Sequence, residues 1–268
     1  MITTMAKHLS QGLCAAALSL LVVAAVTAAP INYGDFSDIP PGSVMYLDVT
    51  ETANTPDDTE PLYGAPSVIG NKLDFDPAGF TAAAAAGTAD LTDGQLNLTL
   101  MGAPAGPGLV NAIKTIAISE RGDYSLLGTG SAATQTNYAV SIAAVTVLEV
   151  SGVPVPGGHV SLPGASASGG DNLAAGTDSL TPWSLGPLYD VGAAWAQTGR
   201  PGSPTKVEIA INDGLVAISE PLSAAFIAKK DFMIDTVSVV VDEIPEPTTM
   251  ALLGLGMCGL GILSRRQG

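Results

Sequence analysis

The chain has 268 residues, of which 13% are charged, and a formal net charge of −15 at pH 7. This length is enough to bury a sizeable core, and the negative charge excludes a protein that binds nucleic acid through a basic face. The 31 glycines and 19 prolines favour an all-β protein with many turns over a helical enzyme.

The first 28 residues predict a secretory signal peptide. A basic residue, Lys7, precedes an apolar run over residues 13–26, and alanines follow at Ala28 and Ala29. A positive start, a short apolar stretch and a small-residue end are the features of such a peptide. The apolar run is shorter than the ~20 residues of a membrane span. We therefore expect cleavage after Ala28.

The two cysteines, Cys14 and Cys258, both lie in apolar segments near the chain ends. The segment between these ends has no cysteine, so it has no disulfide, thiolate metal site or cysteine nucleophile. We expect this exported domain to be stabilised by its core alone.

Residues 29–243 predict an all-β domain, a jelly-roll-like β-sandwich. Apolar side chains alternate with polar ones in several short runs, and one longer run is rich in β-branched residues, as in strands that bury one face. The runs are residues 96–100, 116–118, 138–150, 207–211 and 233–241.

Turn and loop signals separate these runs. Asp93-Gly94 predicts a turn, and Asn212-Asp213-Gly214 predicts a hairpin whose second strand is residues 215–218. The alanines at residues 82–86 favour one or two helical turns. Residues 151–176, rich in Gly, Ser and Pro, predict a long loop in one domain or, alternatively, a linker between two subdomains.

Three aromatic residues, Trp183, Tyr189 and Trp195, lie close together in the sequence. Rings of this kind either pack in the core or form a platform on which sugar rings stack. The second interpretation predicts glycan contacts by these three side chains.

Other chemistry has weaker signals. His159 is the only histidine after residue 28, and it lies in a Gly-rich loop, so we expect neither a Ser-His-Asp triad nor a His-rich zinc site. Acidic pairs, Asp74 with Asp76 and Asp90 with Asp93, offer oxygen ligands of the type that Ca²⁺ prefers. A cofactor is not required, and calcium is the one candidate.

The C-terminal segment, residues 244–268, has three parts in a fixed order. It opens with Pro245, Glu246 and Pro247, continues with an uncharged, Gly-rich apolar stretch over residues 250–263, and ends with a basic cluster. The cluster, Arg265 and Arg266, favours retention on the cytoplasmic side. The apolar stretch is short for a permanent span, so we expect a brief transmembrane helix before processing. Because proline interrupts strands and helices, the last strand is expected to end before Pro245.

This order of motifs resembles the PEP-CTERM sorting domain. The resemblance implies recognition near Pro245, Glu246 and Pro247 by exosortase, a membrane-embedded transpeptidase of Gram-negative bacteria that make extracellular polysaccharide. It also implies that Arg265 and Arg266 form the retention signal. Residues 61–100 resemble ectodomains of planctomycete PEP-CTERM proteins, which adds no activity.

Together these features predict a non-enzymatic exported protein, held in the inner membrane before processing and then at the cell surface or outside the cell. We expect a structural or adhesive role in association with exopolysaccharide. The alternative is a carbohydrate-binding β-sandwich module.

Overall fold

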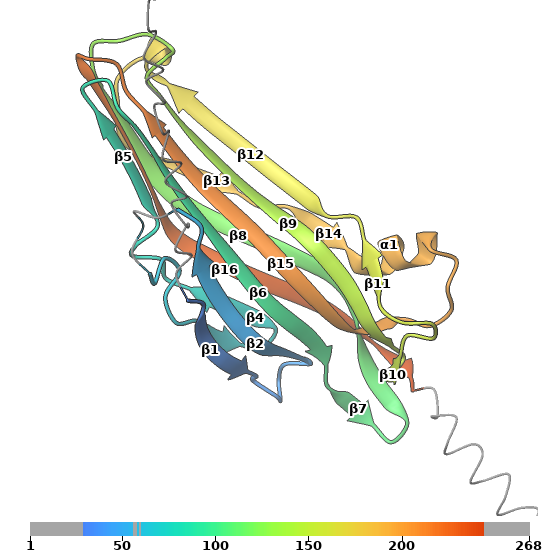
Figure 1. Cartoon of the computed structure of the whole chain (residues 1–268). Helices are drawn as coiled ribbons and strands as arrows, with labels where there is room; N and C mark the ends of the chain where they lie inside the picture. Colours follow the sequence, from blue (N-terminus) through green and yellow to red (C-terminus); the bar gives the residue numbers. More distant parts are fainter. Residues whose placement is uncertain (1–28, 56–57, 59, 244–268) are drawn as a thin grey trace, which may run out of the picture.

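The computed structural model describes residues 29–55, 58 and 60–243, which form two antiparallel sheets packed face to face (Figure 1). The prediction of an all-β sandwich is confirmed. The predicted signal peptide and the C-terminal hydrophobic helix lie outside the described residues.

The first sheet has β15 and β9 near its centre, and neighbouring strands are antiparallel. Its main path runs β1-β2-β6-β15-β9-β10, and β11 and β12 also pair with β9. The bounds are β1 (Ile31–Phe36), β2 (Val44–Ala53), β6 (Ala89–Gly102), β15 (Pro204–Ile218), β9 (Gln135–Val150), β10 (Val153–Pro154), β11 (Val160–Leu162) and β12 (Ala165–Asn172).

The second sheet is built on two long strands, β8 and β16, which pair along nearly their whole length. Its path runs β13-β8-β16-β4-β3, while β7 and β14 pair with β8 and β5 pairs with β16. The bounds are β13 (Asp178–Leu185), β8 (Leu109–Gly128), β16 (Ser223–Asp242), β4 (Lys72–Phe75), β3 (Ser67–Ile69), β7 (Pro104–Gly106), β14 (Leu188–Asp190) and β5 (Thr81–Ala85).

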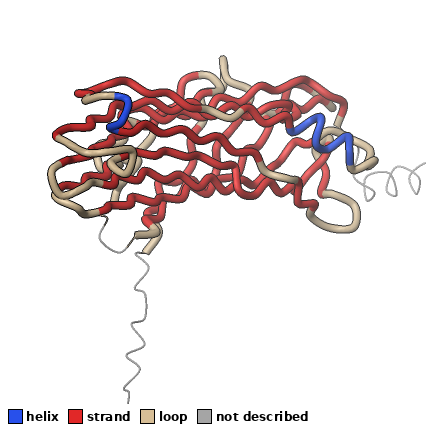
Figure 2. The backbone as a smooth tube through the Cα atoms, turned by 90° about the horizontal axis from the view of Figure 1, so that it is seen from above, coloured by secondary structure: helices blue, strands red, loops and turns tan. Residues whose placement is uncertain are grey.

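Helical structure is limited to two short pieces within the described residues. They are the 3₁₀ turn η1 (Leu173–Ala175) and the helix α1 (Val191–Gln197), whose N-terminus is capped by Asp190 through its carboxylate and the Ala193 N–H. Figure 2 shows these pieces at opposite ends of a body made of long strands.

The core lies between the two sheets and follows the period-2 pattern of the sequence. In β6, Leu96, Leu98 and Leu100 are buried, and in β15 Val207, Ile209 and Ile211 are buried. Side chains at every second position of a strand point to the same face, so each run supplies one apolar wall.

Aromatic side chains concentrate around one point of this core. The ring of Tyr63 meets those of Phe75, Phe80 and Phe232 edge to face, at centroid distances of 5.9, 5.1 and 5.2 Å. All four side chains are fully buried. Such pairs add stability beyond the buried area itself.

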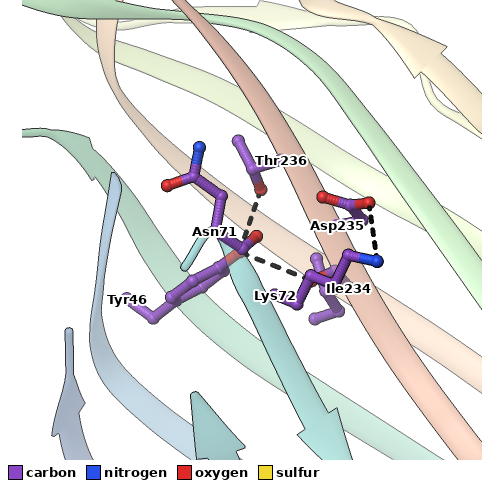
Figure 3. Close-up of polar contacts among 6 residues, drawn as sticks. All are labelled: Tyr46, Asn71, Lys72, Ile234, Asp235 and Thr236. Atoms are coloured by element: carbon purple, nitrogen blue, oxygen red, sulfur yellow. Dashed lines mark hydrogen bonds and ion pairs between the residues drawn. The ribbon is translucent and has the colours of Figure 1, made fainter. Parts of the chain in front are cut away.

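A tyrosine joins the two sheets by polar contacts (Figure 3). Tyr46 of β2 points across the sandwich, and its hydroxyl lies 3.2 Å from Thr236 Oγ1 and beside the carbonyl oxygen of Asn71. Burial raises the pKa of the Tyr46 phenol above its usual range, so the hydroxyl stays protonated and can donate.

The two predicted turns are wrong, because both segments continue as strands. Gly94 of β6 lies opposite Asp213 of β15, and Asp213 also pairs with Val140 of β9. Ladder partners on both sides and a buried carboxylate hold Asp213 in the sheet, which overrides the local turn preference of Asn-Asp-Gly. The predicted hairpin is therefore a single strand.

Two further expectations need correction. The alanine run forms the strand β5, with Ala82 and Ala84 buried, because pairing with β16 satisfies its backbone. The segment expected as a long loop contains β10, β11 and β12, all paired with β9. Glycines fit in β12 because Gly169 and Gly170 lie against the side chains of Tyr138 and Asn137, where a Cβ atom would crowd them.

Candidate functional site

The last strand runs directly to the start of the C-terminal segment. β16 ends at Asp242, and the backbone N–H of Glu243 donates to the carbonyl oxygen of Gly108 at 2.8 Å. The prediction that this strand ends before Pro245 is confirmed. Pro245, Glu246 and Pro247, with Arg265 and Arg266, lie outside the described residues.

The end of the sandwich from which the segment leaves is formed by several chain turns. Figure 1 shows β16 ending at the same end as β7 and β10. A shallow cavity of about 140 Å³ lies there, and Glu149, Gly152 and Glu243 are among its lining residues. Two acidic side chains thus flank the exit of the chain.

Three charged side chains meet in the middle of the core and form what we call the buried charged centre, consisting of Lys229, Glu120 and Asp213. Lys229 Nζ lies 2.5 Å from Glu120 Oε2 and also contacts Asp213 Oδ2. The side chains of Lys229 and Asp213 are 0% exposed and that of Glu120 is 1% exposed. Burial of three ions in an apolar core is costly unless they are paired.

The centre joins both sheets. Asp213 comes from β15 of the first sheet, whereas Glu120 and Lys229 come from β8 and β16 of the second. A bulge in β16 between Lys229 and Asp231 shifts the register against β8. A bulge re-aims the side chains next to it, and here Lys229 is buried whereas Lys230, the extra residue of the bulge, is exposed.

Aromatic rings surround the amine. Lys229 Nζ lies 4.4 Å from the Phe80 ring centroid, 5.1 Å from that of Phe232 and 5.5 Å from that of Tyr63. Burial lowers the pKa of Lys229 to about 8, although the charge of Glu120 acts in the opposite direction. The environment therefore favours a neutral amine far more than water does.

The centre leaves polar atoms without partners. Glu120 Oε1 and Asp213 Oδ1 have no hydrogen-bond partner among the described residues, while Asp213 Oδ2 accepts a hydrogen bond from the Tyr63 hydroxyl at 3.3 Å. Buried polar oxygens in native proteins nearly always have a hydrogen-bond partner, so these two carboxylate oxygens are unusual for a protein core.

Sequence reasoning missed this centre for a specific reason. Asp213 lies in an Asn-Asp-Gly segment that resembles a turn, and Gly94 lies opposite it in a second Asp-Gly pair. A Cβ atom at Gly94 would come within 3.1 Å of the Tyr63 ring and closer to that of Phe80, so the glycine makes room for the aromatic cluster. The available signal was the charged run Lys229-Lys230-Asp231, which interrupts the apolar residues of β16.

A second buried carboxylate positions the aromatic cluster. Glu51 of β2 is 0% exposed and accepts hydrogen bonds from the Leu62 N–H, from the Tyr63 N–H at 3.2 Å and from the Tyr33 hydroxyl at 2.7 Å. These bonds hold the segment that carries Tyr63 against the first sheet.

The three aromatic residues that the sequence left open between core packing and a glycan platform are buried. Trp183, Tyr189 and Trp195 are 6%, 7% and 3% exposed. Trp183 stacks on Tyr138 at a centroid distance of 4.5 Å, and Trp195 Nε1 donates to the Gly202 carbonyl at 3.0 Å. Their burial supports the core-packing interpretation, and glycan contact by these three side chains stays an untested prediction.

Replacement of Trp195 by phenylalanine tests this packing role. We expect the free energy of unfolding to fall by about 1–2 kcal/mol, because phenylalanine leaves the Gly202 carbonyl without its donor and fills less of the site. Urea unfolding followed by the fluorescence of the remaining tryptophan, Trp183, measures the change. An unchanged midpoint would contradict the packing role.

The acidic pairs are not assembled into a cluster. Asp74 lies on β4 and Asp90 on β6, and Asp90 accepts a hydrogen bond from the Ala83 N–H. Within residues 29–55, 58 and 60–243 no group of three or more His, Cys, Asp or Glu side chains is placed to hold a metal ion. Calcium binding stays an untested prediction. His159 is exposed between β10 and β11.

In the part of the chain that the structure describes, no helix has both the length and the apolar character needed to cross a membrane.

Comparison with known families identifies the C-terminal segment. Residues 243–267 match the family described as the PEP-CTERM protein-sorting motif, starting one residue before the predicted segment. The chain therefore carries a PEP-CTERM sorting motif, the C-terminal signal of an exported protein. No curated protein sequence gives a significant match to the chain.

Solved structures give only distant likenesses. TmCBM61 in complex with β-1,4-galactotriose shares 10% sequence identity, with 76% of this chain and 87% of that chain covered and a TM-score of 0.21. The N-terminal cellulose-binding domain of Cellulomonas fimi β-1,4-glucanase C shares 14% identity, with 82% and 100% covered and a TM-score of 0.19.

Proposed function

We propose that this chain is a non-enzymatic surface protein whose β-sandwich is delivered and released through its PEP-CTERM motif. The observation that carries the proposal is the motif at residues 243–267, which follows the last strand almost without a linker. The body then serves a structural or adhesive role outside the cell, in association with exopolysaccharide.

The geometry of the exit supports this order of events. Asp242 ends β16 and Glu243 is still hydrogen-bonded to the sandwich, so Pro245 begins within two residues of the folded body. The two prolines favour extended backbone around Glu246. An exosortase-type transpeptidase would meet an extended Pro-Glu-Pro segment beside the membrane while Arg265 and Arg266 oppose complete translocation.

Mass spectrometry of protein from the cell surface tests the proposal. We expect the wild-type chain to lack residues 250–266 and to start near Ala29, because both terminal signals are removed. Deletion of Pro245–Pro247 should leave the apolar segment attached and at least ten times more of the protein in the inner-membrane fraction.

A matched control is the replacement of Thr248 and Thr249 by alanine, which leaves the Pro-Glu-Pro residues and the arginines in place. This variant should be processed like the wild type. Surface protein that still carries residues 250–266 would show that the tail is a plain anchor, and the sorting proposal would be wrong.

A further inference from the structure

We propose that Lys229 and Asp213 form an intramolecular amide bond inside the sandwich, and that Glu120 is the catalytic residue that transfers the protons. The bond would join Lys229 Nζ to Asp213 Cγ and so link β16 to β15 across the two sheets. This inference does not depend on the proposed sorting function, because the buried charged centre lies in the folded body.

The geometry brings the reacting groups together without any other chain or cofactor. Lys229 Nζ contacts Asp213 Oδ2 and lies 2.5 Å from Glu120 Oε2, and all three side chains are buried. Well-oriented intramolecular groups react as if present at about 10⁵–10⁸ M, so a slow condensation becomes accessible once the fold has placed them.

The step balances without an oxidant or a co-reactant. The Nζ–Cγ bond forms and one Cγ–O bond of Asp213 breaks. The ammonium loses two protons, and both leave with the departing oxygen as one water molecule. Glu120 takes a proton from Nζ and passes it to that oxygen, so the carboxylate ends in its starting state. Three buried charges become one.

The contacts assign different roles to the two carboxylates. The Tyr63 hydroxyl donates to Asp213 Oδ2, which stabilises negative charge on that oxygen when the amine attacks Cγ. Glu120 has no donor on Oε1 among the described residues, so its carboxylate is available as a proton acceptor. Asp213 is therefore the acyl group and Glu120 the proton carrier.

The surroundings favour the reaction in the forward direction. The amine must be neutral to attack, and burial lowers the pKa of Lys229 to about 8. Phe80, Phe232 and Tyr63 enclose the centre. Because these buried rings limit the access of solvent, they protect the new amide from hydrolysis.

The position of the bond suits a protein held by its C-terminus. Under the proposed sorting function, tension on the C-terminal segment would reach the body at Asp242, where β16 ends. A link at Lys229 stops this strand from being drawn out of the sandwich beyond that residue, because β15 is hydrogen-bonded on both sides to β6 and β9.

Tryptic peptides of the purified, denatured full-length protein test the bond. Acylated Lys229 is not cleaved by trypsin, so we expect a peptide of residues 207–230 that is lighter than its sequence by one water molecule. Fragment ions between Asp213 and Lys229 should be missing. An unmodified peptide of residues 207–229 as the main product would overturn the proposal.

The same digest distinguishes the two carboxylates. A bond to Glu120 would instead attach residues 115–121 as a branch, and that branched peptide would overturn the assignment to Asp213. Glu120→Gln, with its fold checked by circular dichroism, should reduce the linked fraction at least tenfold; an unchanged fraction would overturn its catalytic role. Asp123→Asn, which removes the carboxylate paired with the neighbouring Lys230, is the control and should leave the link intact.

Discussion

Replacement of Lys229 by methionine should lower the free energy of unfolding by at least about 3–5 kcal/mol. Methionine has a similar length but no charge, so Glu120 and Asp213 would remain buried next to each other without a cation. Loss of the proposed amide bond would add to the effect, since a cross-link over a loop of this size contributes about 3 kcal/mol in disulfide-bonded proteins. Urea unfolding followed by tryptophan fluorescence measures the sum.

Two further variants separate charge burial from general damage. Lys72→Met removes an exposed lysine whose partner, Asp235, is also partly exposed, so its cost should stay below about 1 kcal/mol. Adding Glu120→Gln and Asp213→Asn to Lys229→Met removes the unpaired buried charges and should recover about 1–3 kcal/mol. A Lys229→Met protein as stable as the wild type would contradict the existence of a buried charged centre.

Replacement of Glu51 by alanine should lower the free energy of unfolding by about 2–5 kcal/mol. The change leaves the N–H groups of Leu62 and Tyr63 without an acceptor inside the core, and the Tyr33 hydroxyl also loses its partner. Each unsatisfied buried donor costs about 1–3 kcal/mol. Tyr63 would lose its anchoring to β2, so the aromatic cluster around Lys229 should loosen as well.

Chemical denaturation with hydrogen exchange at residues 62 and 63 measures both effects. Glu51→Gln keeps one acceptor oxygen and should lose less stability than Glu51→Ala. Glu208→Ala, at an exposed position of β15, is the surface control and should stay within about 0.5 kcal/mol of the wild type. Equal stability of the Glu51 and Glu208 variants would show that the hydrogen bonds to Glu51 contribute nothing.

The class of fold could be predicted because its signal is local. Alternating residues such as Leu96, Leu98 and Leu100 define a strand with one buried face whatever its partners are, and a run of such strands has few stable arrangements other than packed sheets. The sorting segment could also be predicted from the sequence, because its prolines, glycines and arginines follow one another in a fixed order along a short stretch of chain.

The aromatic residues show where local information ended. The sequence did not distinguish whether Trp183, Tyr189 and Trp195 pack in the core or form a binding platform. The residues that neighbour an aromatic ring in the sequence can be the same in both cases. Only the positions of β8, β9 and α1 decided that all three are buried.

Periodicity and contiguous motifs were enough to predict an exported β-sandwich with a C-terminal sorting motif, because they need no knowledge of distant contacts. Contacts between distant segments, in contrast, make Asn212-Asp213-Gly214 and Asp93-Gly94 strand rather than turn and bring Lys229 to Glu120 and Asp213. Turn preference is a small local free energy, and ladder hydrogen bonds on both sides of β15 together with a buried ion pair outweigh it. Such long-range pairing follows from how the two sheets pack and has no pattern in the sequence alone.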